Sequence, residues 1–337
     1  MENRNGIIVA GNWIVDHIKT IDVYPEQDAL ANIEKEFFSN GGAPFNVAKD
    51  IAKLGASFPI KAVGVIGNDA NGEWIKNDCR ENGIDTSGLI ITDKAPTSYT
   101  DVMSVKSTGR RTFFHQRGAN ALLDIEHFDF TNCTEKIFHL GYLLLLDKLD
   151  EIENNGKTRA ATVLEAAQKN GLKTSVDIVS ENSNRFNRIV TPALPYINYL
   201  FINEFEASRT TGIELKGDFP ELEKLKEAAT KLINAGVNDI VFIHFPFGVY
   251  ALNSEGKEFL QGAVKFPKEK IKSVVGAGDA LAAGILFALH NNWEIEEIIK
   301  LGVSVAAASL QHLSCSGGVI NYKECLMFEE KYGFKVL

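Results

Sequence analysis

Short apolar runs alternate with longer amphipathic segments through most of the 337-residue chain, and this alternation limits the possible folds more than any other feature. Runs of this length, separated by helical patterns, are typical of buried strands. Six of them lie at residues 6–10, 60–65, 136–140, 173–177, 199–202 and 239–244. Strands and helices that alternate in this way predict a mostly parallel sheet covered by helices on both faces.

The segments between the runs have helical periodicity. Val47, Ile51 and Leu54 fall on one face of a predicted helix. Gly236 is placed to end a second helix, because glycine readily adopts the left-handed conformation found there. The apolar face of that second helix consists of Leu222, Leu225, Ala229 and Leu232.

Two stretches break the pattern, because they contain strand-like runs but no helical face. We therefore predict a three-layer α/β domain made of residues 1–15, 41–96 and 119–337. Residues 16–40 and 97–118 would form a small extra sheet that stands off this domain. Two ordinary surface hairpins are the alternative.

The composition supports a folded domain and argues against two kinds of partner. Hydrophobic residues make up 45% of the chain, enough to offset the entropy lost on ordering it. The net charge of −9 argues against an extended nucleic-acid surface, which needs excess Lys and Arg. The longest apolar stretch, residues 280–289, is about half the ~20 residues of a membrane helix. Four scattered cysteines fit a reducing compartment, so we expect a cytoplasmic protein. From the charge and the short apolar stretch, we expect neither nucleic-acid nor membrane partners.

A glycine-rich turn precedes an apolar helical segment at residues 273–284. Peptide N–H groups at a helix start lack partners within the helix, and glycine lets an anion approach them closely. Gly276, Ala277 and Gly278 are therefore candidates for an anion hole. Asp279, the one charged residue between 273 and 289, could accept the proton of an attacking hydroxyl group there. The alternative is that Asp279 merely caps a buried helix.

Asn203 and Glu206 directly follow the predicted strand at residues 199–202. The carboxyl ends of parallel strands form the crevice in which α/β proteins bind ligands. One carboxylate with a polar neighbour suffices for Mg²⁺, because this ion keeps several of its waters. The pair is therefore a candidate magnesium site; an acidic first helical turn without a ligand is the alternative.

A second glycine pair precedes the first predicted helix. Gly42 frees the backbone there, and Pro44 suits the first helical turn. Asn46, one turn into the helix, could hydrogen-bond a polyol, and Asp16, after the first strand, could accept hydrogen bonds from paired sugar hydroxyls. The alternatives are a local backbone partner for Asn46 and a turn role for Asp16.

The order and spacing of these three motifs resemble the ribokinase-like (PfkB) sugar kinase family over nearly the whole chain. Residues 41–56, GGAPFNVAKDIAKLGA, look like the N-terminal motif of that family, and residues 273–284, SVVGAGDALAAG, look like its C-terminal motif. The resemblance implies a large Rossmann-like domain, a small β lid, and transfer of the γ-phosphoryl group of ATP to a primary hydroxyl group.

The resemblance also implies roles for the residues at matching positions. Asp279 would be the base, and Gly276, Ala277 and Gly278 would form the anion hole. Asn203 and Glu206 would order Mg²⁺ through water. Asp16, Gly42 and Asn46 would hold the sugar.

Several positions depart from the family pattern or stay open. Residues 273–275, Ser-Val-Val, replace the Asp-Thr-Thr of many members, which leaves a bound monovalent cation open. In the nucleotide-binding loop at residues 244–248, only Gly248 is kept. Arg117 could reach a substrate hydroxyl or phosphate from the lid, or pair with a surface acid.

We therefore predict an ATP- and Mg²⁺-dependent kinase that phosphorylates a hydroxyl group of a small sugar. Residues 41–44 resemble fructokinases, whereas residues 11–18 and 117–120 resemble ribokinases, so a fructose-like or a ribose-like sugar is expected. A nucleoside kinase is one alternative, and a catalytically silent sugar-binding regulatory protein of the same fold is another. A homodimer joined through the lid is expected by analogy, because exposed β edges invite pairing.

Overall fold

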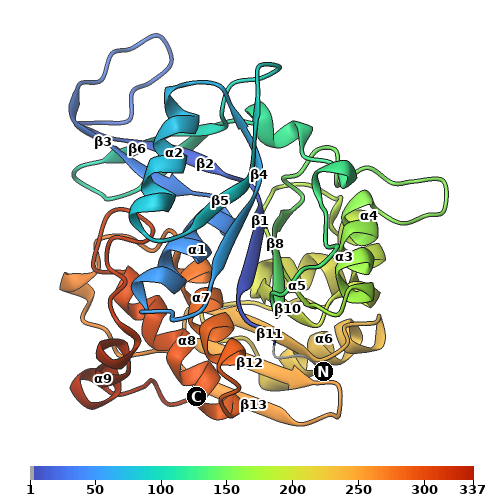
Figure 1. Cartoon of the computed structure of the whole chain (residues 1–337). Helices are drawn as coiled ribbons and strands as arrows, with labels where there is room; N and C mark the ends of the chain where they lie inside the picture. The colour runs from blue at the N-terminus through green and yellow to red at the C-terminus, as the bar shows by residue number, and fades with distance from the viewer. Residues whose placement is uncertain (1–3) are drawn as a thin grey trace.

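The computed structural model describes residues 4–337, with a nine-stranded sheet at its centre (Figure 1). The strands lie in the order β13-β12-β11-β10-β9-β8-β1-β4-β5. They are β1 (Ile7–Gly11), β4 (Ile60–Gly67), β5 (Asp85–Thr92), β8 (Ile137–Leu143), β9 (Lys173–Ile178), β10 (Tyr199–Asn203), β11 (Ile240–Phe245), β12 (Gly248–Asn253) and β13 (Glu258–Gly262). All pairs from β5 to β11 are parallel, and β12 and β13 extend one edge antiparallel. The mostly parallel sheet predicted from the sequence is confirmed.

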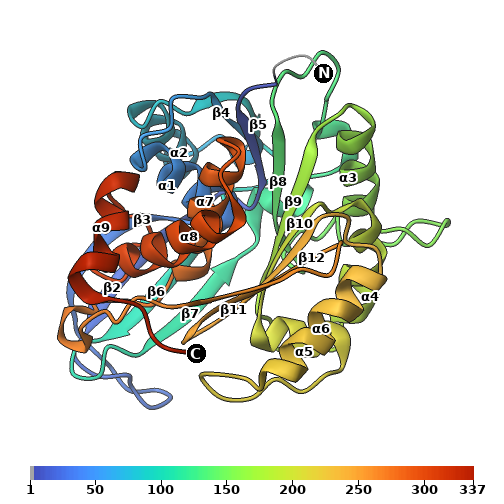
Figure 2. The same cartoon turned by 90° about the horizontal axis from the view of Figure 1, so that it is seen from below.

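Helices cover both faces of this sheet, as Figure 2 shows. One face carries α1 (Ala43–Lys53), α2 (Ala70–Glu81), α7 (Ala277–His290), α8 (Ile295–Ser309) and α9 (Tyr322–Tyr332). The other face carries α3 (Arg159–Lys169), α4 (Phe186–Val190), α5 (Glu204–Thr211) and α6 (Leu222–Asn234). Alternate residues of β1 enter the two cores, Ile7 and Val9 on the first face and Ile8 and Ala10 on the second.

A separate four-stranded sheet stands beside this body, at the upper left of Figure 1. Its strands lie in the order β3-β2-β6-β7 and are β2 (Ile14–Ile21), β3 (Ile33–Gly41), β6 (Tyr99–Val105) and β7 (Arg111–Gln116). The prediction of a second, smaller sheet is thus confirmed. The division of the chain into a body and a moving lid stays our proposal.

Glycine is required at the two helix starts that the motifs predicted. Gly42 precedes α1 with φ 81°, and a side chain there would place Cβ 1.9 Å from the carbonyl oxygen of Asn12. Gly276 precedes α7 with φ 83°, a conformation that side-chain-bearing residues rarely adopt. These glycines let both helices begin beside the carboxyl ends of the sheet strands.

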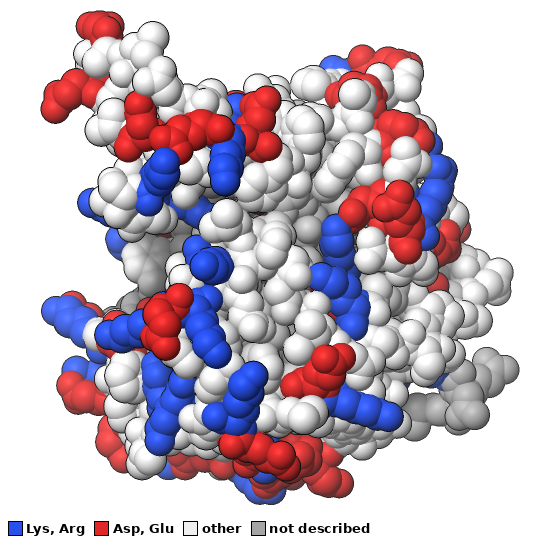
Figure 3. Space-filling view, turned by 90° about the vertical axis from the view of Figure 1, so that its left-hand side faces the viewer, with Lys and Arg blue, Asp and Glu red and all other residues white. Residues whose placement is uncertain are grey.

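Acidic and basic side chains are interspersed on the face of the molecule shown in Figure 3, around a central area with few charges. This face therefore has no extended surface of one sign. Within residues 4–337, no helix has the length and the apolar composition needed to cross a membrane.

Candidate active site

Asp279 lies in the first turn of α7, and only 4% of it is exposed. The Tyr142 hydroxyl donates to its carboxylate and lies 2.8 Å from both oxygens. The Asn46 amide, from α1, donates to Oδ2 at 2.7 Å. Asp279 is thus held by side chains from β8 and α1, at the carboxyl end of the central sheet.

A second acid, Asp177 near the end of β9, lies against Asp279. Burial raises the pKa of Asp177 well above its ordinary value, and the neighbouring Asp279 charge raises it further. Burial also raises the pKa of Asp279, while hydrogen bonds from Asn46, Tyr142 and Asp177 lower it. Asp177 therefore holds a proton more tightly than Asp279 does, which favours Asp279 as the charged base of the pair.

The turn before Asp279 presents free peptide N–H groups. Within residues 4–337, the N–H groups of Gly276, Gly278 and Asp279 have no hydrogen-bond acceptor. The Ala277 N–H differs, because it donates to the carbonyl of Val274 at 3.3 Å. The three free groups at the positive end of the α7 dipole can accept an anion beside Asp279.

Two side chains border this turn. A Cβ added at Gly276 would lie 2.7 Å from Cβ of Cys315, and one at Gly278 would lie 3.3 Å from Cε1 of His244. His244 of β11 pairs with Asn203 of β10, and this pair is the last one between the two strands. Burial lowers the pKa of His244 to about 4, so the ring is neutral at pH 7. The anion hole thus lies next to the strand end that carries Asn203.

Asn203 and Glu206 cap α5 reciprocally. The Asn203 side chain accepts from the Glu206 N–H at 2.8 Å, and Glu206 accepts from the Asn203 N–H at 2.9 Å. Ser180 donates to the other oxygen of Glu206 at 2.7 Å. Burial raises the pKa of Glu206 to about 7. The structure thus gives the pair a local capping role that the sequence analysis did not consider. Glu206 is also one of the charges that raise the pKa of Asp177.

These oxygen donors fit a hydrated magnesium ion. Among residues 4–337, no group of three or more His, Cys, Asp or Glu could hold a metal by itself. Mg²⁺ prefers oxygen ligands and usually takes several of them from water and phosphate. The carboxylate of Glu206, with Asn203 beside it, is sufficient for an ion bound in that way.

Two of the predicted sugar ligands, Asp16 and Asn46, lie near Asp279. Asp16, on β2, packs so closely against Gly41 that a Cβ there would lie 2.4 Å from its Oδ1. Burial raises the pKa of Asp16 to about 7, against a hydrogen bond from Thr100, which lowers it. Asn46 accepts from the Asn40 amide at 2.6 Å while it donates to Asp279. The structure thus brings Asp16 and Asn46 to the base, with Gly42 at the start of the helix that carries Asn46.

Two other predicted residues lie apart from Asp279. Arg117 is 3.0 Å from Asp147, so it pairs with a surface acid, one of the two alternatives for it. Gly248 begins β12 and pairs with Phe245 across the turn from β11. Neither residue contacts Asp279.

The sequence reasoning missed three residues of this site: Tyr142, Asp177 and Arg111. Asp177 had a usable signal, because it ends a predicted strand in the same way that Asn203 does. Thr20 pairs with Ser104, and Ser104 pairs with Arg111, so these three residues lie on one face of the small sheet. Asp16 lies four residues before Thr20 on the same strand and therefore shares that face with Arg111. Only the strand register could reveal that relation.

Asp150 provides a test of pH-dependent stability. It is 5% exposed, its Oδ1 accepts from the Leu144 N–H at 3.1 Å, and Oδ2 lies 3.9 Å from Arg185. Burial raises its pKa from 3.8 to about 7, against Arg185 and Arg117, which lower it. The folded state therefore holds this proton more tightly than the unfolded state does. The stability that this provides is present below about pH 4 and is lost as pH rises through about 7.

We expect Asp150→Asn to raise the free energy of unfolding at pH 8 by about 2 kcal/mol, because the neutral amide removes the buried charge. The gain should shrink toward pH 4, where wild-type Asp150 is protonated. Urea unfolding of both proteins from pH 4 to 8 measures this difference. A variant less stable than wild type at pH 8 would show that the ion pair with Arg185 outweighs the cost of burial.

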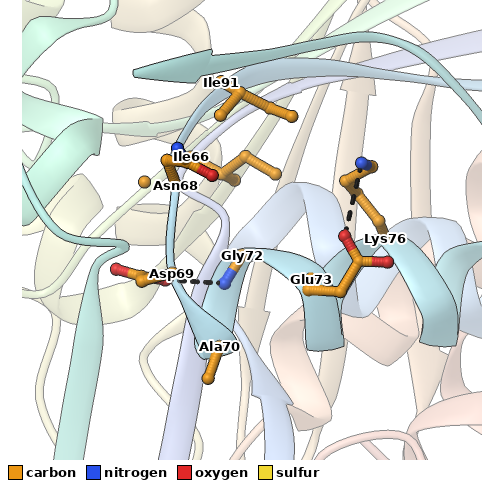
Figure 4. A pocket seen from close by; sticks show the side chains of 9 residues that line it. Ile66, Asn68, Asp69, Ala70, Gly72, Glu73, Lys76 and Ile91 are labelled. Atoms are coloured by element: carbon orange, nitrogen blue, oxygen red, sulfur yellow. Dashed lines mark hydrogen bonds and ion pairs between the residues drawn. The ribbon is translucent and has the colours of Figure 1, made fainter. Parts of the chain in front are cut away.

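A cavity of about 280 Å³ lies elsewhere, at the start of α2 (Figure 4). Its lining includes Asp69, whose carboxylate accepts from the N–H groups of Gly72 and Thr97 at 2.9 and 2.7 Å. Glu73 and Lys76, also in the lining, face each other at 3.4 Å. The charged groups of this cavity are already paired, and none of them contacts Asp279.

Comparison with known proteins identifies the family of the chain. Residues 10–320 match the family model described as pfkB family carbohydrate kinase. A 5-dehydro-2-deoxygluconokinase of Geobacillus kaustophilus is 23% identical over 87% of this chain and 85% of its own. A ribokinase of Haemophilus influenzae is 23% identical over 97% and 99% of the two chains. The solved structure of an Arabidopsis thaliana ribokinase complexed with ribose and ATP superposes with a TM-score of 0.78, at 22% identity over 96% and 98% of the chains.

Proposed function

The chain belongs to the pfkB family of carbohydrate kinases, and we propose that it transfers the γ-phosphoryl group of ATP to a hydroxyl group of a fructose- or ribose-like sugar. One observation carries the proposal: the start of α7 holds the Asp279 carboxylate together with three N–H groups that have no acceptor within residues 4–337. A base and an anion hole at that spacing supply what phosphoryl transfer requires, namely alignment and charge stabilisation.

In the proposed reaction, the acceptor oxygen forms a bond to the γ-phosphorus while the bond from that phosphorus to the bridging oxygen of ADP breaks. Asp279 takes the hydroxyl proton, and the free N–H groups of Gly276, Gly278 and Asp279 stabilise the charge on the moving phosphoryl group. Asp16, Gly42 and Asn46 orient the sugar. Glu206, with Asn203, would hold Mg²⁺ through water, and the bound ion would neutralise phosphate charge.

A coupled assay of ADP formation tests this proposal with MgATP and a panel of fructose, ribose, 5-dehydro-2-deoxygluconate and adenosine. We expect turnover with at least one sugar and less with adenosine. Turnover with adenosine alone would establish the nucleoside kinase alternative. Tight binding of a sugar without ADP formation would favour the silent regulatory alternative.

A sugar acid is a second candidate acceptor, and Arg111 favours it. The name of the Geobacillus relative denotes a kinase of such an acid. Arg111 shares the sheet face of Asp16, and its guanidinium donates to the carbonyl of Leu313 at 3.0 Å. The other N–H groups of its planar fork can bind a carboxylate bidentately.

If the acceptor is a sugar acid, Arg111→Met should raise its KM about 10- to 100-fold, the equivalent of one charged hydrogen-bonded contact. The KM for a neutral sugar should change much less. The neighbouring Arg110→Met is the matched control, because Arg110 is exposed and makes no side-chain hydrogen bond within residues 4–337. Equal effects on acidic and neutral sugars would remove Arg111 as a carboxylate ligand.

Pairing of two copies through the small sheet and a cytoplasmic location stay predictions. Exposed aromatic side chains on that sheet, Phe38, Phe113 and Phe114, support the pairing. Sedimentation velocity would test it.

A further inference from the structure

The Tyr142 hydroxyl lies at the position that an acceptor hydroxyl would need at the base. Tyr142 is half-buried, and its oxygen is 2.8 Å from both Asp279 oxygens. Burial raises the pKa of this phenol well above its ordinary value, and the Asp279 charge raises it further. The phenol is therefore protonated at neutral pH and donates to the carboxylate, as a sugar hydroxyl would do before transfer.

Other side chains also surround the carboxylate of Asp279, a residue that is only 4% exposed. Asn46 donates to Oδ2 at 2.7 Å, and Asp177 lies next to the carboxylate. Asn46 is itself held by Asn40 at 2.6 Å, and Asp177 accepts from the Ile178 N–H at 2.8 Å. Among these partners within residues 4–337, Tyr142 alone carries a hydroxyl group and is not fully buried. Because Asp279 is nearly buried, an acceptor hydroxyl must displace one of these partners to reach it, and the phenol belongs to the partner with the most exposed surface.

We propose that Tyr142 is a gate residue, whose phenol occupies the acceptor position at Asp279 until a sugar hydroxyl displaces it. The inference rests on the proposed function and adds a safeguard against wasteful ATP hydrolysis. In that side reaction, a water oxygen bonds to the γ-phosphorus, the bond to ADP breaks, and Asp279 takes the water proton. With the phenol in place, water cannot reach the base while MgATP is bound alone.

Tyr142→Phe tests the gate, because it removes only the phenol oxygen and leaves space for about one water beside the carboxylate. We expect sugar-independent ATP hydrolysis, measured as phosphate release from MgATP, to rise at least tenfold. The KM for the acceptor sugar should fall, because the sugar no longer competes with the phenol. Adding Asp279→Asn to this variant should abolish the extra hydrolysis.

Tyr250→Phe is the matched control. Tyr250 is buried in β12, and its hydroxyl donates to the Glu258 carboxylate at 3.0 Å, far along the sheet from Asp279. This substitution removes the same kind of hydrogen bond, so its ATP hydrolysis should equal that of wild type. An equal rise in both variants would overturn the gate and indicate a general loosening of the fold.

The result separates the gate from the proposed function. Sugar-dependent ADP formation in wild type, without increased hydrolysis in Tyr142→Phe, overturns the gate and keeps the kinase. Increased hydrolysis in Tyr142→Phe, without turnover of any tested sugar, keeps the gate and removes the proposed acceptors. No hydrolysis and no transfer in either protein would overturn both, and phosphate found on Tyr142 itself would overturn the gate.

Discussion

Replacing Asp279 by Asn should lower kcat for sugar phosphorylation by about 10³-fold, which is within the usual contribution of a general base. The amide has the shape of the carboxylate but cannot take up the proton of the attacking hydroxyl. Burial raises the pKa of Asp279, so removing its charge should leave the free energy of unfolding at neutral pH unchanged or higher. Steady-state rates with MgATP and the acceptor, together with urea unfolding, measure both effects.

Asp150→Asn is the matched control for this variant. Asp150 is another buried acid whose pKa burial raises, and it does not contact Asp279. We expect its kcat to equal that of wild type. A kcat for Asp279→Asn within tenfold of wild type would contradict the assignment of Asp279 as the base.

Gly276→Ala should lower kcat by about 10²-fold, comparable to the loss of one anion-hole donor. The added methyl group would lie 2.7 Å from Cβ of Cys315, closer than real Cβ contacts, so the turn must shift. A displaced turn no longer presents the N–H groups of Gly276 and Gly278 to the phosphoryl group. The variant should also lose stability, through the strain of its left-handed backbone and through this contact.

Gly256→Ala separates the two causes. Gly256 has φ 84°, against 83° at Gly276, but an added Cβ would meet nothing within 4 Å. Both variants carry the backbone strain, and only Gly276→Ala carries the contact with Cys315. We expect Gly276→Ala to lose about 1–3 kcal/mol more stability, and Gly256→Ala to keep its activity. Equal activity losses would place the effect in the backbone strain, not in the anion hole.

The helix starts could be predicted because their geometry is local. Gly276 and Asp279 are three residues apart, and a helix start leaves its first N–H groups unpaired whatever surrounds it. The same holds for Asn203 and Glu206, whose reciprocal cap forms within one turn. The buried strands were equally accessible, because runs such as residues 199–202 and 239–244 carry their own hydrophobic pattern.

The partners of these groups could not be predicted in the same way. Tyr142 meets Asp279 across 137 residues of sequence, and Asn46 meets it across 233. Arg111 reaches the Asp16 face through the register of β6 with β7, and a shift by one residue would turn it away. Arg117 pairs with Asp147, an alternative that the sequence could not decide.

By itself, the sequence determined six of the nine strands of the central sheet, the glycine turns and the acid in the first turn of α7, because these depend on patterns within a few residues. Tertiary structure alone decided which side chains surround that acid and in which direction burial and neighbouring groups shift its pKa. Those outcomes depend on distance and burial between segments far apart in the chain, and no local pattern encodes either quantity.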